Sequence, residues 1–414
     1  MESQVHDAEP FQLLNPPYRY YKYEFERYWY FFQTFGLIGY DPRTPEDVWN
    51  REFEKRFGKT AGAVLKQALD EASQVMPRIV ASCYPYSFFP TTSAWPEKQR
   101  LGDLPLYARA EGSDLQQYAG FDEEAQVLLG QLETAKTLPS TTSAWLAGLS
   151  EDILRKTAEA EKTIDAHNSK EFYSTVTDLK MLANLALYHA RRIPAAVSYC
   201  LFLRTRDVTA LDEAIRHEQH AADAWKQLVD AAGDVYAENI LIGKKPLSGH
   251  WRDEWELLNR GLEKLKEQRA QFTPDKPVET APRYRPATDA DNSRYFHITH
   301  TAIETAEASR PITVTVDIDA PAGIKWVRLQ YRSVNQYKDF EMLPMTATGA
   351  YTFRATISAE KIDTQYDLMY LIEMMDHNSK GFIYPDANKE TPYRIVRLKR
   401  PSAGMSSGRD LAGQ

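Results

Sequence analysis

The sequence predicts an all-α helical bundle domain followed by a β-sandwich. Three long segments carry apolar residues at steps of three and four, which places one apolar stripe on each of three consecutive helices. A proline-rich stretch follows Phe272, and beyond it the apolar period changes to two, the period of strands. A chain of 414 residues is long enough for both parts to bury a core.

The bundle is organised around three helices, which we expect over Ser169–Asp207, Val208–Tyr236 and His250–Phe272. Ser169 and Asp207 are each placed to cap the helix that follows them. Pro194 lies inside the first pattern, so we expect a kink or a break close to it. A helix bundle is first of all a scaffold, because packing patterns carry fold information more often than chemistry.

An aromatic helix precedes the bundle over residues 20–35. Its rings fall on nearly every face, so it must be buried on several sides, which needs more surface than one neighbouring helix offers. Thr44 and Pro45 begin the next helix. A further amphipathic helix, Thr60–Met76, is expected to stop at Pro77.

Residues 84–118 are predicted to be irregular backbone in which aromatic, proline and polar residues alternate. Sugar recognition needs flat rings for stacking and planar polar groups for hydroxyls, and positioned loops commonly supply both. The candidate ligand-binding residues are Trp95, Arg100, Tyr107, Glu111, Asp114 and Gln117. The alternative is that the rings attach this loop to the bundle while the acids face water.

Alternating segments after the linker predict about seven short strands, which are typical of an immunoglobulin-like or fibronectin-like sandwich. Trp326 alternates with Val327 and Leu329 in one of them, and we interpret it as a core residue, so any sugar contact by the sandwich should be weak. The predicted segments are a lead (1–19), a helical domain (20–272), a linker (273–294), the sandwich (295–400) and a disordered tail (401–414).

Composition excludes several classes of function. The net charge is -8 and the basic residues are dispersed, which argues against a nucleic-acid partner. The apolar runs are too short for a membrane span, and the polar start lacks a signal-peptide core, so the chain as written would stay in the cytoplasm. Cys83 and Cys200 are interpreted as small buried apolar residues, although the sequence leaves a disulfide between them open.

No cofactor or metal is predicted. His217 and His220 lie three apart on a helix with Glu213 one turn earlier, but a second helix with matching ligands is not evident. A phosphate loop and a nucleophile elbow are not evident either. Glu111 and Asp114 are too close in sequence to be the facing carboxylates of a glycosidase, so the chain carries no catalytic signature.

Several short motifs stand out along the chain: Asn15–Trp29, Phe35–Gly36, Gly39–Pro42, Trp49, Glu52–Gly58, Tyr188–Arg191, Phe202–Thr205 and Gly249–Asp253. Together they resemble the region that follows the catalytic barrel in large bacterial glycoside hydrolases of the alpha-glucuronidase-like and family 20-like groups. The distal sandwich resembles the fibronectin-like modules of such proteins. The resemblance implies an accessory C-terminal part of an enzyme of carbohydrate metabolism, with a polysaccharide that contains uronic acid or a related polysaccharide as its ligand. The parent protein would then be secreted or periplasmic.

The same resemblance implies a catalytic barrel as a partner, and the chain shows no barrel pattern before residue 20. Two other functions stay open. The chain could be a non-catalytic interaction module that uses the aromatic helix 20–35 to bind another chain or a second copy of itself. It could also be a stand-alone enzyme with a site in the loop 84–118.

Overall fold

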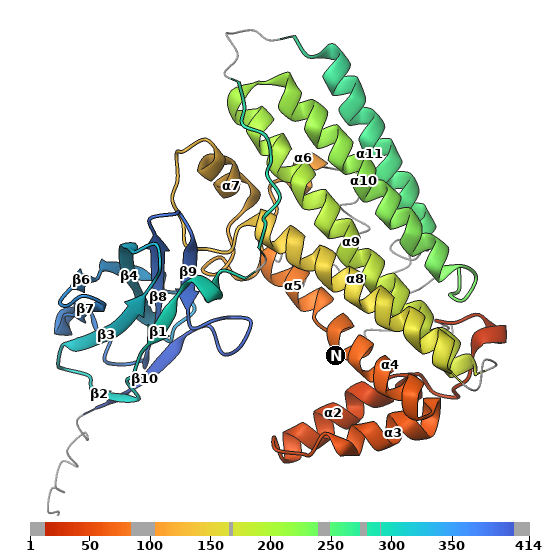
Figure 1. Ribbon diagram of the computed structural model, residues 1–414, viewed down its shortest axis with the longest axis horizontal. Helices are drawn as coiled ribbons and strands as arrows, with labels where there is room; N and C mark the ends of the chain where they lie inside the picture. Colours follow the sequence, from red (N-terminus) through yellow and green to blue (C-terminus); the bar gives the residue numbers. More distant parts are fainter. Residues whose placement is uncertain are drawn as a thin grey trace, which may run out of the picture. The chain divides into compact units, whose positions relative to one another are not determined.

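The chain consists of a helical unit and a β-sandwich, as the sequence predicts (Figure 1). The computed structural model describes residues 13–83, 104–164, 169–238, 249–273, 280–289 and 291–400. The helical unit comprises Met1–Leu132 and Leu138–Ala290, and the sandwich unit comprises Glu133–Thr137 and Asp291–Gln414. The predicted tail, 401–414, and much of the predicted lead lie outside the described residues.

Among its described residues, the helical unit begins with seven shorter helices and continues with four long ones. The shorter ones are α1 (Glu24–Arg27), α2 (Trp29–Tyr40), α3 (Asp47–Phe57), α4 (Lys59–Ala72), α5 (Val75–Ser82), α6 (Leu104–Tyr107) and α7 (Phe121–Leu128). The long ones, which lie side by side in Figure 1, are α8 (Pro139–Thr163), α9 (Lys170–Thr205), α10 (Val208–Ala232) and α11 (Trp251–Gln271). None of the described helices is both long enough and apolar enough to cross a bilayer.

The three predicted bundle helices are confirmed as α9, α10 and α11. Both predicted caps are also confirmed, because Ser169 Oγ accepts from the backbone N–H of Phe172 and Asp207 Oδ1 accepts from that of Thr209. Arg206, with φ +62°, makes the corner between α9 and α10. Local signals therefore determined where these helices begin.

Helix α9 runs unbroken through Pro194, so the predicted break is absent. Pro194 cannot donate to the carbonyl of Ala190, four residues earlier. The hydroxyl of Ser143, on α8, donates to that carbonyl at 2.6 Å in a buried contact. The neighbouring helix thus supplies the hydrogen bond that the proline removes.

The predicted aromatic helix is divided into α1 and α2 at Tyr28. The carboxylate of Glu26 accepts from the backbone N–H groups of Lys22 and Tyr23, which begins α1 at residue 24 rather than 20. Pro77 was predicted to end a helix, but it does not do so. It lies in the first turn of α5, where a missing N–H costs nothing.

The sandwich contains two sheets with a shared core. The first has the order β1-β3-β7-β6, and the second has the order β2-β10-β8-β4-β5, with β9 paired to β8. The strands are β1 (His297–Thr299), β2 (Thr305–Glu307), β3 (Ile312–Asp319), β4 (Ile324–Ser333), β5 (Glu341–Pro344), β6 (Thr346–Ala347), β7 (Thr352–Ile357), β8 (Leu368–Asp376), β9 (Gly381–Tyr384) and β10 (Arg394–Lys399). Inward residues of both sheets, Val314 and Ile372 among them, form one apolar core.

Strand β8 is buried along its whole length, which shows that both of its faces are covered. One cover is the segment Glu133–Thr137, where Ala135 packs against Leu371 and Ile383. Gly381 lies so close to Ala135 that a Cβ on it would be 2.5 Å from that Cα atom. A short piece of chain from the middle of the helical sequence is therefore built into the sandwich unit.

Trp326 does not belong to the core between the two sheets. Val327 and Leu329 face that core, whereas Trp326 lies half-buried on the opposite face of β4, where it packs on the cluster of Ala135 and Leu371. The interpretation of Trp326 as a core residue therefore holds only for this smaller cluster, because the two-residue period of a strand turns it away from the core between the sheets.

Candidate functional site

The structure gives separate positions to the predicted loop residues. Trp95 and Arg100 lie outside the described residues. Tyr107 and Gln117 are buried, while Glu111 is exposed. Asp114 accepts from the backbone N–H of Gln117 at 3.2 Å, which closes a turn. These contacts attach the described part of the loop to the bundle, and the ligand site assigned to it stays a prediction.

Tyr107 belongs to a buried polar cluster that also contains Tyr188, His189, Arg192 and Glu218. Its hydroxyl lies 3.0 Å from His189 Nδ1, and the guanidinium of Arg192 lies 4.6 Å from the centre of its ring. Arg192 donates to both carboxylate oxygens of Glu218, at 3.2 and 2.9 Å. Burial lowers the pKa of His189 to about 3, so this imidazole is neutral at physiological pH. The cluster joins α6, α9 and α10 and is closed to water, which fits a structural role.

His217 and His220 pack beside each other with ring centroids 6.2 Å apart, and His217 also contacts Tyr284. Burial lowers the pKa of His217 to about 4. Among the described residues there is no group of three or more His, Cys, Asp or Glu side chains that could hold a metal ion. Cys83 and Cys200 are buried free thiols, and burial raises their pKa to about 11 and about 12, respectively.

A groove rich in aromatic side chains lies where the N-terminal segment meets α2, α3 and the start of α9. We call it the aromatic groove. Its volume is about 460 Å³, and it is lined by Tyr20, Tyr21, Phe25, Glu26, Trp29, Phe32, Arg56 and Glu171. Most of these residues belong to the two motifs Asn15–Trp29 and Glu52–Gly58. The groove thus collects residues from distant parts of the sequence into one concave surface.

Three side chains of the aromatic groove, Trp29, Arg56 and Glu171, are joined by polar contacts. Glu171 Oε1 accepts from Trp29 Nε1 at 3.1 Å and from the guanidinium of Arg56 at 2.8 Å. Arg56 also lies over the ring of Trp29, 4.3 Å from its centroid, and its Nε donates to Glu52 at 2.8 Å. These contacts fix the orientation of all three groups, and two carboxylates offset the charge of Arg56.

Glu26 is the second carboxylate of the aromatic groove. Hydrogen bonds from the backbone N–H groups of Tyr23 and Lys22 lower the pKa of Glu26. A general acid in glycoside hydrolysis needs a raised pKa, so Glu26 does not fit that role. The aromatic groove therefore suits binding better than acid catalysis.

A second set of contacts holds the groove in place from behind. Arg27 Nη2 donates to both oxygens of Asp178, at 2.7 and 2.6 Å, and to the hydroxyl of Tyr236 at 2.6 Å. Tyr236 also donates to Asp178. The carboxylate lies on α9, so the short helix α1 is attached to the longest helix of the bundle. Sites held by such supporting contacts keep their geometry when a ligand binds.

Stacked rings and orientated polar groups are the two elements of sugar recognition. The sequence predicted this chemistry for the loop 84–118 and gave the aromatic helix a role in burial. The groove was missed because Trp29 and Glu171 are remote in sequence. The resemblance motifs, which contain Trp29 and Arg56, were the one signal that pointed to it.

Comparisons with known proteins agree with a fold of this kind. No protein-family model and no curated protein matches the chain. Among solved structures, the chain is similar to part of a glycoside hydrolase. That structure is a GH138 enzyme targeting pectin rhamnogalacturonan II, with a TM-score of 0.51 and 13% sequence identity. The match covers 63% of this chain but only 40% of that chain, so this chain spans less than half of the enzyme's length. At this identity the similarity is one of fold.

Proposed function

We propose that the chain is a carbohydrate-binding accessory part of a glycoside-hydrolase-type protein, with a polysaccharide containing uronic acid, or a related polysaccharide, as its ligand. The observation that carries the proposal is the aromatic groove, in which exposed rings surround the fixed contacts of Trp29, Arg56 and Glu171. The fold similarity to part of a GH138 enzyme supports it. The fibronectin-like character of the sandwich and the alpha-glucuronidase-like affiliation belong to the same proposal.

The charges of the aromatic groove favour a neutral sugar residue of such a polysaccharide. Arg56 is already paired with Glu52 and Glu171, and Glu26 adds a further negative charge. A uronate carboxylate placed here would be repelled, whereas hydroxyl groups could donate to the carboxylates. The side chain of Phe25 is 59% exposed and that of Phe32 is 50% exposed, so both rings offer faces for stacking.

The proposal is tested by titrating the full chain with neutral and uronic-acid oligosaccharides in a calorimeter. Replacing Phe25 or Phe32 with Ala should weaken binding of the neutral sugar about three- to tenfold, because each removes a stacking ring. Phe35→Ala is the matched control, since Phe35 is exposed on the same helix but does not line the groove. Equal weakening by Phe35→Ala would contradict a defined site.

The loop 84–118 is tested in the same titration. Trp95→Ala and Glu111→Gln should leave the affinity of the aromatic groove unchanged. If they abolish binding while Phe25→Ala does not, the site lies in the loop instead. Cleavage of an oligosaccharide by the intact chain, lost in Glu111→Gln, would establish the alternative of a stand-alone enzyme.

Helix α2 favours a second function, a protein–protein contact. It contains no charged residue, and none of its residues is buried. Its most exposed rings are Phe31, Phe32, Phe35 and Tyr40, with exposed fractions of 56%, 50%, 73% and 93%. With the rings of the preceding residues, and at about 200 Å² per fully exposed ring, this surface amounts to roughly 800 Å², which is one side of a standard interface.

The partner proposed for α2 is a catalytic barrel or a second copy of the chain. Sedimentation analysis of the purified chain, compared with the Phe31→Ser and Phe35→Ser double variant, distinguishes the two. A concentration-dependent dimer that the double variant loses would establish self-association. A monomer with an unaltered profile in both proteins would leave the barrel as the partner.

A further inference from the structure

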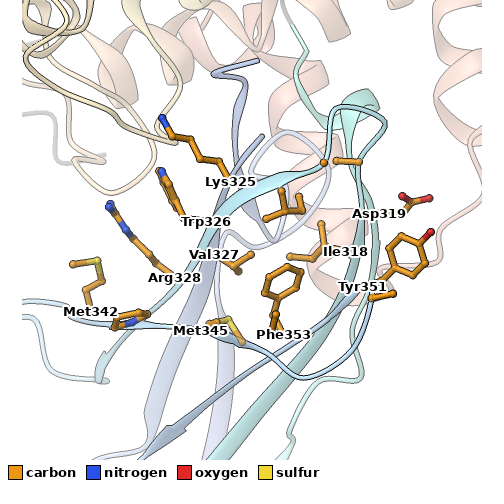
Figure 2. A pocket seen from close by; sticks show the side chains of 16 residues that line it. Ile318, Asp319, Lys325, Trp326, Val327, Arg328, Met342, Met345, Tyr351 and Phe353 are labelled. Atoms are coloured by element: carbon orange, nitrogen blue, oxygen red, sulfur yellow. The ribbon is translucent and has the colours of Figure 1, made fainter. Parts of the chain in front are cut away.

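The sandwich unit contains a second hollow, of about 770 Å³. Its lining comes from the end of β3, the start of β4, the β5–β6 connection and the start of β7. Figure 2 shows that β4 divides the lining into two sides. Apolar core residues such as Val327 and Phe353 lie on one side, and Lys325, Trp326 and Arg328 project from the other.

A β-bulge accounts for the grouping of these three side chains. The pairing of β4 with β8 shifts between Ile324 and Trp326, so Lys325 is an extra residue in the ladder. Side chains alternate along a regular strand, but a bulge inserts a residue and redirects its neighbours. Lys325 and Trp326 consequently project to the same side as Arg328, two residues further on (Figure 2).

Of the two cationic side chains on this side, Lys325 forms an ion pair with a described residue and Arg328 does not. Lys325 is paired with the carboxylate of Glu133. Arg328 lies over the ring of Trp326, 4.0 Å from its centroid, and forms no ion pair with any residue that the structure describes. Its cross-strand neighbour Glu373 accepts a hydrogen bond from Gln330, and the charge of Arg328 acts on Glu373 and on Glu133 from a distance.

Arg332 provides a comparison, because it also lies over an aromatic ring but has a hydrogen-bond acceptor for its guanidinium. It lies on the same face of β4, 4.6 Å from the ring centroid of Phe340, and donates to the backbone carbonyl of Lys338 at 3.1 Å. Arg328 lies over its ring in the same way, but no residue that the structure describes offers it such an acceptor. A guanidinium held over an indole ring keeps its fork of N–H groups available to a bidentate anion.

We propose that Trp326 and Arg328 form a binding site for a uronate residue of a polysaccharide. Arg328 binds the sugar carboxylate through paired N–H groups, Trp326 positions the guanidinium, and the exposed Met342 contacts the C–H face of the sugar ring. The choice of a sugar as the carrier of the carboxylate rests on the proposed function. The aromatic groove and this site then divide the ligand between them, neutral residues at one and acidic residues at the other.

The test is calorimetric titration of the full chain with trigalacturonate and with the corresponding neutral galactose trimer. Arg328→Gln should raise the Kd for trigalacturonate about tenfold or more, because it removes a charge-assisted pair of hydrogen bonds. The Kd for the neutral trimer should not change. Raising the salt concentration should weaken trigalacturonate binding in the wild type more than in Arg328→Gln.

The matched control is Arg354→Gln, which removes the same charge from an exposed position on β7, in the other sheet. It should bind trigalacturonate like the wild type. Unchanged trigalacturonate affinity in Arg328→Gln, or equal weakening by both variants, would overturn the proposal. Binding of the neutral trimer, lost in Phe32→Ala, would leave the proposed function intact in that case. Trigalacturonate binding that disappears in Phe32→Ala and persists in Arg328→Gln would place the acidic ligand in the aromatic groove and overturn the site on β4.

Discussion

Glu124 is a buried carboxyl group beside the start of α8, where its Oε2 accepts from the backbone N–H of Ser140 at 2.8 Å. Burial raises the pKa of Glu124 from 4.5 to about 7. The folded protein therefore holds this proton more tightly than the unfolded chain does. The contribution to stability is fully present below about pH 4.5, decreases as the pH rises to about 7, and is constant above that.

Replacing Glu124 with Gln removes this titration and keeps an acceptor for Ser140. Between pH 4.5 and pH 7.5 the stability of the variant relative to the wild type should rise by an amount on the order of 3 kcal/mol. Thermal unfolding at a series of pH values measures it. Glu151→Gln, on the exposed side of α8, is the control and should show no such trend. If the stability difference between Glu124→Gln and the wild type does not change with pH, the raised pKa of Glu124 is contradicted.

Arg192 and Glu218 form a buried ion pair whose side chains are 1% and 2% exposed. Replacing Glu218 with Ala leaves a buried charge without its partner and should cost about 3–5 kcal/mol in urea unfolding. The surface pair of Arg204 and Asp122 provides the comparison, because Asp122→Ala should cost less than about 1 kcal/mol. Similar losses for the two variants would show that burial does not govern the contribution of these pairs.

At the scale of a helix, Ser143 and Pro194 form a complementary pair. Ser143→Ala leaves the buried carbonyl of Ala190 without a donor and should cost about 1–3 kcal/mol. When Pro194 is also replaced with Ala, its new N–H can donate to Ala190 along the helix. The second substitution should recover most of the loss, and unfolding of the two single variants and the double variant measures the coupling. Purely additive losses would show that the proline and the serine are independent.

At the scale of the whole molecule, the connection between the two units is partly anchored. Ala281 and Tyr284 are buried in the helical unit, and the N–H of Ala281 donates to Asp207 Oδ2 at 2.8 Å. Part of the segment predicted as a linker, residues 281–284, is therefore attached to the helical unit. Limited trypsin digestion should cut slowly at the exposed Arg283, and Tyr284→Ala should accelerate this cut. Equal rates in the two proteins would show that the anchor is weak.

A chain cut after Arg283 should stay together. The segment Glu133–Thr137 remains packed on β8 and β9 of the sandwich through Ala135, although it belongs to the N-terminal fragment. The two fragments should co-elute in size-exclusion chromatography and separate only in denaturant. Separation under native conditions would show that the packing of Glu133–Thr137 on the sandwich does not hold the fragments together. An isolated fragment 295–400 should also be less stable, because it loses the cover of Leu371 and Ile383.

Much of the fold could be predicted because its signals are local. The apolar periods of α9, α10 and α11 and the caps at Ser169 and Asp207 involve residues within a few positions of one another. The change to a period of two marked the sandwich for the same reason. These features follow from the geometry of a helix and a strand, which every short segment obeys by itself.

The candidate sites and the exceptions depended on tertiary structure. Trp29 donates to Glu171, and Ser143 donates to the carbonyl that Pro194 leaves free, although these partners are far apart in sequence. The face that Trp326 takes follows from its register with β8. By itself the sequence determined the fold class, the long helices, their caps and the presence of many aromatic residues. Tertiary structure alone decided which rings and charges meet, because partners far apart in sequence leave no periodic or local pattern and are chosen only when the elements pack.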